Sequence, residues 1–299
     1  MDLYLAIVHP DTVRMFYEKT GIKANFLISY AYQEGNISKL VKTYRHMIKK
    51  LAIDSGAYSV ITGKKKIPLR EYIEFLLRYG DYFDICFSLD DRFDDAEHNL
   101  ENQMQLENAL RDKLWKPIPV IHDFEDPYKE FELYVGLGHD YVAIGSMGAR
   151  KKVPQEVIAK IKENYPEIKT HLFGDLNLAK LKKFRPFSAD SAGWAHQGGK
   201  GGSIMYWRRS ENKAYIYNVG AIDSTINQKY HLKNSSFYDE IMHFIEPFGF
   251  TYPSLVSSAN DRWVLNMYFF TQVEDYLTNL KAVEPEKLPQ KTSKRRTKK

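Results

Sequence analysis

Short apolar runs alternate along the chain with longer segments in which apolar residues recur at helical spacing. Eight such runs are candidate strands, at residues 3–8, 26–31, 51–53, 85–89, 118–121, 141–144, 170–173 and 187–189. Several are apolar at consecutive positions, which is typical of parallel strands buried on both faces. Helices are predicted between them at residues 38–50, 69–79, 96–114, 154–164 and 176–183.

Eight strand-then-helix units within about 190 residues predict an α/β protein built as a (β/α)8 TIM barrel, here residues 1–200. A doubly wound open sheet is the alternative. No Gly-x-Gly-x-x-Gly turn follows the first strand, which disfavours a dinucleotide-binding protein.

The pattern changes after the eighth strand. Residues 203–208 and 214–219 predict a β-hairpin, and two helices are predicted at 237–248 and 260–280. We expect these additions, residues 201–283, to pack on the barrel. Residues 284–299 are predicted to be a disordered basic tail.

Composition narrows the class of protein. The single cysteine, Cys86, excludes an internal disulfide and any zinc site made of several thiolates. No apolar run approaches the roughly 18 residues that a membrane span requires. The first residues show no basic region followed by an apolar core. The sequence therefore predicts a soluble, cytoplasmic protein with no membrane partner.

The net charge of +5 is unevenly distributed. Residues 287–299 contain seven basic side chains and no acidic ones, so without them the charge falls from +5 to −2. Such a tail can contact the phosphates of a nucleic acid, with salt-dependent affinity. It can equally serve as a solubilising terminus, and both interpretations stay open.

Polar residues and glycines follow six of the predicted strands. These segments are residues 54–58, 90–91, 122–123, 145–148, 174–175 and 190–191. In a (β/α)8 barrel the carboxyl ends of the strands converge on one mouth, where active sites are found. Six separate segments are therefore predicted to build one polar pocket.

Three carboxylates in this set suggest glycosyl chemistry. A retaining mechanism needs a nucleophilic carboxylate and a second carboxyl group that gives and takes protons. Anions also stabilise the oxocarbenium-like transition state. Asp54, Asp90 and Asp190 can supply these roles, although the residue types alone do not assign them.

Other polar residues at the strand ends favour structural roles. An aspartate after a strand commonly caps a helix or forms a local turn, and we prefer this for Asp91, Asp123 and Asp175. His122 fits a backbone hydrogen bond or a functional contact equally well. The glycine-rich residues 198–202 lack the P-loop pattern, so a flexible loop is preferred over a phosphate cradle.

Four of these segments resemble the tRNA-guanine transglycosylase superfamily, and most closely its DpdA-type members, which place 7-deazaguanines in DNA. The segments are residues 54–59, 87–90, 142–146 and 187–191, in the family's order. The first, Asp-Ser-Gly-Ala-Tyr-Ser, is close to the family's Asp-Ser-Gly-Gly-(Phe/Tyr)-Gln. The likeness covers roughly residues 25–195.

The resemblance implies a role for each matching residue. Asp190 matches the nucleophile that attacks C1′ of the sugar, and Asp54 matches the acid/base that handles the proton of the leaving and entering base. Tyr58 matches the aromatic residue on which the base stacks. Asp90 matches the carboxylate that accepts hydrogen bonds from the N1–H and 2-amino groups of guanine.

The remaining substrate-binding residues follow from the same motifs. Gly145 falls at the turn whose backbone lines the base pocket, and Ser55 and Ser146 lie in the motifs beside it. His122 stands where the family usually has a glutamine that contacts the base oxygen, so this contact departs from the family pattern.

Two departures bear on the partner. The family's RNA-acting enzymes carry a structural zinc held by three cysteines and a histidine, which this chain cannot form. Trp194-Ala195-His196 also stands where the family has Pro-Thr-Arg. Both losses fall in regions that serve tRNA, so DNA and a 7-deazaguanine base are the predicted partners, with tRNA as the alternative. No cofactor or metal is expected.

Several points stay open at this stage. A base in duplex DNA must be flipped out, and Trp194 or Trp207 could fill its place, although core packing is the commoner fate of tryptophan. A retaining N-glycosidase is the alternative reaction. A non-catalytic binding subunit is disfavoured, because binding needs neither Asp54 nor Asp190. A homodimer and a monomer are both compatible with the sequence. The resemblance places the protein in a bacterial or phage-infected cell.

Overall fold

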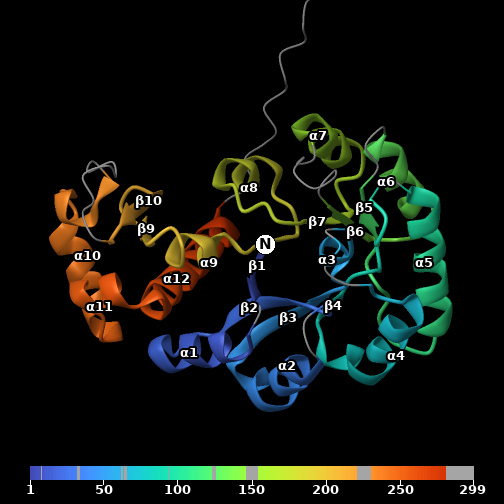
Figure 1. Ribbon diagram of the computed structural model, residues 1–299. Helices are drawn as coiled ribbons and strands as arrows, with labels where there is room; N and C mark the ends of the chain where they lie inside the picture. Colours follow the sequence, from blue (N-terminus) through green and yellow to red (C-terminus); the bar gives the residue numbers. More distant parts are fainter. Residues whose placement is uncertain are drawn as a thin grey trace, which may run out of the picture.

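Eight parallel strands form a curled sheet at the centre of the larger part of the molecule (Figure 1). A computed structural model describes residues 1–7, 9–31, 34–61, 63, 66–93, 95–122, 126–145, 154–220 and 230–280. The strands are β1 (Asp2–Ile7), β2 (Ala24–Ser29), β3 (Ile48–Asp54), β4 (Ile85–Cys86), β5 (Val120–Ile121), β6 (Tyr141–Ile144), β7 (Lys169–Leu172) and β8 (Ser188–Ser191). Their order in the sheet is β4-β3-β2-β1-β8-β7-β6-β5. All eight predicted strands and the predicted fold class are confirmed.

The edges of the curled sheet, β4 and β5, meet through a parallel bridge between Phe87 and Ile118. The N–H of Ile118 donates to the carbonyl of Cys86 at 2.8 Å, and the N–H of Ser88 donates to the carbonyl of Ile118 at 2.9 Å. This contact brings the sheet round on itself, as a barrel requires and a doubly wound open sheet does not.

Helices alternate with the strands, and all but the short α3 lie around the outside of the sheet (Figure 1). They are α1 (Asp11–Thr20), α2 (Glu34–Lys39), α3 (Ala57–Ile61), α4 (Leu69–Tyr79), α5 (Ala96–Ala109), α6 (Pro127–Gly136), α7 (Gln155–Asn164) and α8 (Leu178–Phe184). The helix predicted at residues 69–79 is confirmed at its bounds. Asp95 begins α5, because its side chain accepts from the N–H of His98 at 3.0 Å.

The helix predicted at residues 38–50 was wrong in its last part. The helical segment continues from α2 through a π-helix, Leu40–Tyr44, and a 3-10 turn, Arg45–Met47, and then β3 begins at Ile48. Pairing of β3 with β2 overrides the helical spacing of this segment, as tertiary context commonly does.

The strands separate two apolar regions. Successive residues of a strand point to opposite faces, so Ile53 packs outward against the helices while Ala52 and Asp54 alternate with it and face inward. The interior of the barrel is filled by Tyr4, Leu27, Ala52, Ile85, Phe87, Ile118, Val120 and Ala143. Inward residues at the carboxyl ends of the strands therefore face a single mouth.

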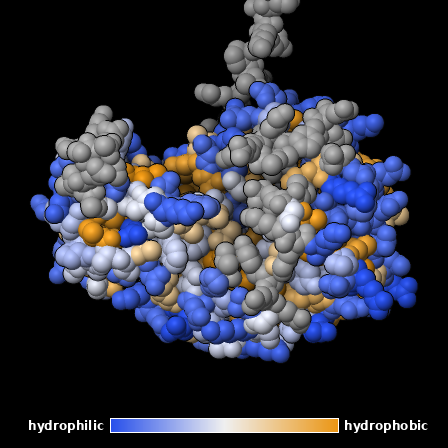
Figure 2. Space-filling view, in the orientation of Figure 1, coloured by the Kyte–Doolittle hydropathy of each residue, from blue (hydrophilic) through white to orange (hydrophobic). Residues whose placement is uncertain are grey.

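In the residues that the structure describes, the C-terminal part adds a hairpin and four α-helices beside the barrel (Figure 1). Its elements are α9 (Gly193–Gly198), β9 (Ser203–Arg208), β10 (Lys213–Asn218), α10 (Tyr238–Ile245), α11 (Tyr252–Ser257) and α12 (Ala259–Asn279). Helix α12 packs against β9, α9 and β1, and apolar side chains appear in the recess between these additions and the barrel (Figure 2). The predicted hairpin is confirmed, whereas α11 was not predicted. No helix in the described ranges combines the length and apolarity needed to cross a membrane.

Both tryptophans considered as base-flipping wedges belong to the core. Trp194 is buried and donates its indole N–H to the carbonyl of Ala6 at 3.1 Å. Trp207 is buried against Phe269 and Tyr276. Neither side chain is placed to enter a nucleic acid duplex.

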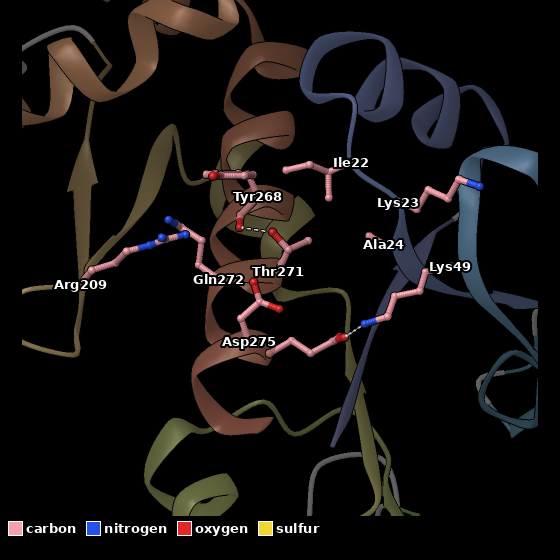
Figure 3. A pocket seen from close by; sticks show the side chains of 10 residues that line it. Ile22, Lys23, Ala24, Lys49, Arg209, Tyr268, Thr271, Gln272 and Asp275 are labelled. Carbon is pink, nitrogen blue, oxygen red and sulfur yellow. Dashed lines mark hydrogen bonds and ion pairs between the residues drawn. The ribbon is translucent and has the colours of Figure 1, made fainter. Parts of the chain in front are cut away.

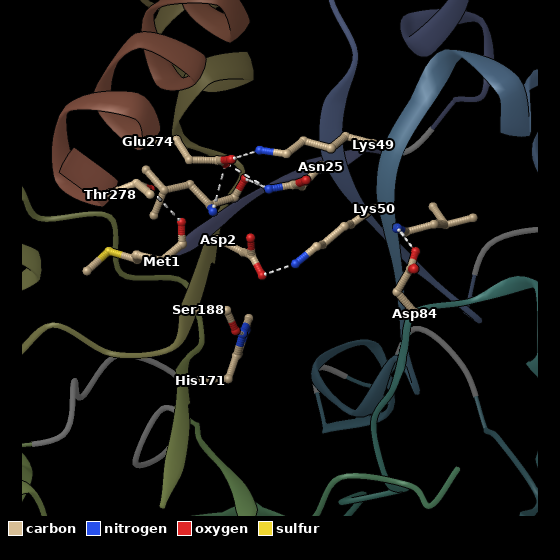
Figure 4. Close-up of polar contacts among 12 residues, drawn as sticks. Met1, Asp2, Asn25, Lys49, Lys50, Asp84, His171, Ser188, Glu274 and Thr278 are labelled. Atoms are coloured by element: carbon tan, nitrogen blue, oxygen red, sulfur yellow. Dashed lines mark hydrogen bonds and ion pairs between the residues drawn. The ribbon is translucent and has the colours of Figure 1, made fainter. Parts of the chain in front are cut away.

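A buried carboxylate fastens α12 to the amino-terminal end of the barrel (Figure 4). Glu274 accepts from the backbone N–H of Leu3 at 3.0 Å and from the amide of Asn25 at 2.7 Å, and it forms an ion pair with Lys49. A shallow cleft of about 230 Å³ lies here between α12, Arg209 and the first residues of β2 (Figure 3). This cleft is at the opposite end of the strands from Asp54.

Replacing Glu274 by alanine should destabilise the fold. The buried N–H of Leu3 and the amide of Asn25 would both lose their acceptor, at a cost of about 2–4 kcal/mol. Urea unfolding would measure the difference. The neighbouring Asp275 is exposed, so Asp275→Ala should change the free energy of unfolding by less than about 0.5 kcal/mol. Equal losses in the two variants would contradict the anchoring role.

Candidate active site

The mouth of the barrel brings together most of the residues expected to form a site. Those that the structure places at the carboxyl ends of the strands are Asp54, Ser55, Asp90, His122, Gly145 and Asp190. Tyr58 lies in α3 nearby, but only its backbone is among the described residues. Ser146 lies outside the described residues.

Asp54, the last residue of β3, is a half-buried carboxyl group with an unusual affinity for its proton. It accepts hydrogen bonds from the N–H of Gly56 and the hydroxyl of Ser29. Burial, reinforced by the negative charges of Asp90 and Asp190, nevertheless raises its pKa from 3.8 to about 7. Asp54 can therefore both give and take a proton near neutral pH.

Gly56 makes this arrangement sterically feasible. Its φ of 91° lies in the left-handed region, and a Cβ here would stand 2.6 Å from Cβ of Ala31 and 2.8 Å from Oγ of Ser29. Only glycine lets the end of β2 approach this closely. Gly56, the third residue of the Asp-Ser-Gly sequence, thus allows the Ser29 hydroxyl to lie within hydrogen-bonding distance of Asp54.

Asp90 is a buried carboxylate held on both oxygens. The hydroxyl of Ser55 donates to Oδ1 at 3.0 Å, and Nε2 of His122 lies 2.5 Å from Oδ2. The next carboxylate in sequence points elsewhere: Oδ1 of Asp91 lies 2.8 Å from Nε2 of His98 and accepts from the amide of Asn102 at 3.0 Å. Asp90 therefore belongs to the mouth, and Asp91 fastens α5 to the loop after β4.

Two other aspartates were expected to have structural roles. Asp175 accepts from the N–H of Asn177 at 3.1 Å, which is an Asx turn, and pairs with Lys180 at 2.7 Å. The local turn expected of Asp175 is thus present. Asp123 lies outside the described residues.

His122 is clamped between an aromatic ring and a glycine. Its imidazole stacks on Phe93 with ring centres 3.9 Å apart and an interplanar angle of 16°. A Cβ at Gly145 would lie 2.0 Å from Cε1 of the imidazole, so Gly145 provides the space that the ring occupies. The ring nitrogen Nε2 is directed at Asp90, and the structure thus gives His122 a carboxylate partner where the resemblance implied a base oxygen.

Asp190, in β8, is buried, and its hydrogen bonds with the described residues are made by the single oxygen Oδ1. Its Oδ1 accepts from the N–H of Gly174 at 2.9 Å and lies 3.3 Å from Nε2 of His171. His171 was not among the predicted site residues, because it forms part of the apolar run that predicts β7. The available signal was a single ionisable side chain at an inward-facing position of a buried strand.

The mouth is rich in carboxylates. Within the described ranges no group of three or more His, Cys, Asp or Glu residues is arranged to hold a metal ion. Fold and mouth together define a (β/α)8-barrel protein whose three carboxylates meet at the carboxyl ends of the strands. Comparison with known proteins adds no family name: no family model matches the chain, and no curated protein matches it.

Replacing Asp54 by asparagine should stabilise the protein at high pH and change it little near pH 4. The folded protein holds the Asp54 proton up to about pH 7, whereas the unfolded chain loses it near pH 3.8. Stability therefore falls as pH rises through this window, and the penalty is complete above it. The gain in the variant should reach a few kcal/mol at pH 8.

Urea unfolding at pH 4, 6 and 8 would measure this dependence. Asp91→Asn is the matched control, because Asp91 lies outside the mouth and pairs with His98. A gain in Asp54→Asn that is the same at all three pH values would show that Asp54 ionises normally in the folded state.

Proposed function

We propose that this protein is a transglycosylase that exchanges guanine in DNA for a 7-deazaguanine base through a covalent aspartyl-sugar intermediate on Asp190. The observation that carries the proposal is one carboxyl group of raised pKa beside two other carboxyl groups. Asp54 has a pKa of about 7 beside the charges of Asp90 and Asp190. A retaining glycosyl mechanism needs one carboxyl group that transfers protons and a nearby carboxylate that attacks the sugar. The three aspartates at the mouth fit this requirement.

The chemistry divides into two half-reactions. In the first, a carboxylate oxygen of Asp190 bonds to C1′, the bond between C1′ and the base breaks, and Asp54 gives its proton to the departing guanine. In the second, Asp54 takes a proton from the incoming 7-deazaguanine, whose nitrogen attacks C1′ and releases the Asp190 carboxylate. Asp54 ends protonated and Asp190 ionised, as they began. The negative charges at the mouth stabilise the oxocarbenium-like transition states.

Asp90 is the residue best suited to recognise the base. Ser55 and His122 fix the orientation of its carboxylate, and each carboxylate oxygen has two lone pairs, so acceptor capacity remains. A guanine-type base offers two adjacent donors, N1–H and the 2-amino group. Adenine offers no donor at these positions and would leave the buried charge poorly satisfied, which disfavours it strongly.

DNA is the proposed substrate because the features of the family that serve tRNA are missing from this chain. The zinc-binding cysteines are absent and Trp194 begins the segment after the nucleophile. A tRNA-acting enzyme is the alternative substrate class, and a retaining N-glycosidase is the alternative reaction. In a duplex the target guanine must leave the stack to reach the mouth, at a cost of a few kcal/mol.

Labelled guanine should be incorporated into duplex DNA by the wild-type protein, and Asp190→Ala should abolish incorporation. Because the nucleophile is lost, the rate should fall by about 10⁴-fold or more. DNA binding should persist, and a mass spectrum of the wild type quenched with DNA alone should show a sugar adduct on Asp190. Labelling of tRNA but not DNA would favour the RNA enzyme, and release of free base without exchange would favour the glycosidase. Full activity in Asp190→Ala would exclude the mechanism.

Replacing Asp90 by asparagine should impair exchange with guanine-type bases far more than replacing Asp91. The amide would present a donor to a donor of the base, a loss of about 2–4 kcal/mol and hence roughly 10²-fold in kcat/KM. Asp91→Asn should be mild, because Asp91 faces His98 and Asn102 outside the mouth. Competition between labelled guanine and adenine would measure the change in selectivity. The reverse order of effects would assign base recognition to Asp91.

A further inference from the structure

His171 occupies an enclosed position inside the barrel, directly beneath Asp190. Its side chain is fully buried. The rings of Phe87, Phe173 and Tyr4 surround it, with centres 4.8, 4.6 and 6.3 Å away. An imidazole in such surroundings is costly unless its nitrogens are hydrogen-bonded. Its polar contacts are therefore the reason that it can be accommodated.

Both ring nitrogens belong to one hydrogen-bonded chain. The hydroxyl of Tyr141 lies 2.5 Å from Oγ of Ser188, and this Oγ lies 2.5 Å from Nδ1 of His171. Nε2 of His171 then lies 3.3 Å from Oδ1 of Asp190. The chain runs from the first residues of β6 and β8 up to the mouth, and Figure 4 shows Ser188 and His171 next to one another.

An ionised Asp190, which the proposed function requires, gives this chain one direction when the imidazole is neutral. An ionised carboxylate only accepts, so Nε2 of His171 must carry the proton. In a neutral imidazole Nδ1 then accepts, and the Ser188 hydroxyl donates to it. Oγ of Ser188 accepts in turn from the Tyr141 hydroxyl. In this arrangement each O–H or N–H of the chain has an acceptor. Each one donates in the direction that leads from Tyr141 to Asp190.

We infer that His171 is a positioning residue that assigns the attacking oxygen of Asp190. With the N–H of Gly174 at 2.9 Å, it fills both lone pairs of Oδ1. No hydrogen bond reaches Oδ2 from the part of the chain that the structure describes. Oδ2 is therefore the oxygen that bonds to C1′, and Oδ1 becomes the carbonyl oxygen of the aspartyl ester. The covalent step rests on the proposed function, whereas the contact between His171 and Asp190 does not.

The same contacts serve both half-reactions. When Oδ2 bonds to the sugar, Oδ1 keeps its two donors and the ester stays fixed in one orientation. When the incoming base attacks C1′, negative charge returns to the carboxylate, and the donors are already in place to stabilise it. His171 touches neither sugar nor base in this scheme and acts through Asp190 alone.

The first test does not depend on activity. Nitrogen NMR of the wild-type protein labelled at histidine should show His171 with its proton on Nε2 and an accepting Nδ1. Carbon NMR of the labelled aspartates should show a displaced carboxyl resonance for Asp190 in His171→Leu, because a hydrogen-bond donor to Oδ1 is lost. A wild-type Nδ1–H tautomer, or an Asp190 carboxyl resonance that does not respond to His171→Leu, would overturn the inference.

The second test uses variants that separate the donor from the bulk of the ring. His171→Gln keeps an N–H near the position of Nε2, so the single-turnover rate of adduct formation with DNA should remain near that of the wild type. His171→Leu should lose on the order of 10²-fold in this rate, the scale of a small misplacement of a reacting group. Its dissociation constant for DNA should not change. Ser188→Ala should lie between them, because the tautomer of His171 is no longer enforced.

Thr170→Val is the matched control, since Thr170 is equally buried on the same strand and its hydroxyl has no hydrogen-bond partner among the described residues. Its adduct rate and Asp190 carboxyl resonance should match the wild type. Equal rates in folded His171→Leu and His171→Gln would overturn the positioning role. If wild-type protein forms no adduct with DNA or tRNA, the proposed function fails, while the NMR arm still decides whether His171 holds Asp190.

Discussion

Burial of three neighbouring carboxyl groups at one end of a closed barrel, reinforced by their mutual repulsion, is the constraint around which the mouth is organised. Asp54, Asp90 and Asp190 cannot all carry full charge cheaply in a partly buried space. The surrounding donors distribute the cost unequally. Asp90 has Ser55 and His122, and Asp190 has Gly174 and His171. Asp54 receives hydrogen bonds too, but burial and its neighbours outweigh them, so it is the group that keeps a proton to about pH 7.

Two glycines, Gly56 and Gly145, make these donors available because a side chain at either position would collide with its neighbours. At Gly56 a Cβ would collide with the end of β2, and at Gly145 it would collide with the imidazole of His122. The first glycine brings the Ser29 hydroxyl towards Asp54, and the second admits the ring that holds Asp90. The first glycine therefore influences the pKa of Asp54 and the second the orientation of the Asp90 carboxylate, although neither carries a side chain of its own.

The sequence predicted the strands and the mouth because both depend on local signals. Apolar runs with polar residues after them identify parallel strands and the end at which they open, and the different directions of Asp90 and Asp91 follow from alternation along the chain. Helix bounds were less predictable: β3 begins at Ile48, inside a segment of helical spacing, because pairing with β2 decides its structure. The role of His171 was not predictable, since a lone histidine in an apolar run does not reveal its contacts with Ser188 and Asp190 on a different strand.

The anchoring of α12 also has a consequence for how the chain folds during synthesis. Glu274 accepts from the N–H of Leu3, a contact that spans 271 positions in sequence, and β1 pairs with β8 on one side and β2 on the other. Contacts of such long range form late, because the entropy of closing the intervening loop must be offset first. While the chain emerges from the ribosome, β1 can pair with β2, but its other edge stays open until β8 has been made. An unpaired strand edge of this kind invites association with other chains. The nascent protein is therefore most vulnerable to aggregation before β8 has been synthesised and has paired with β1.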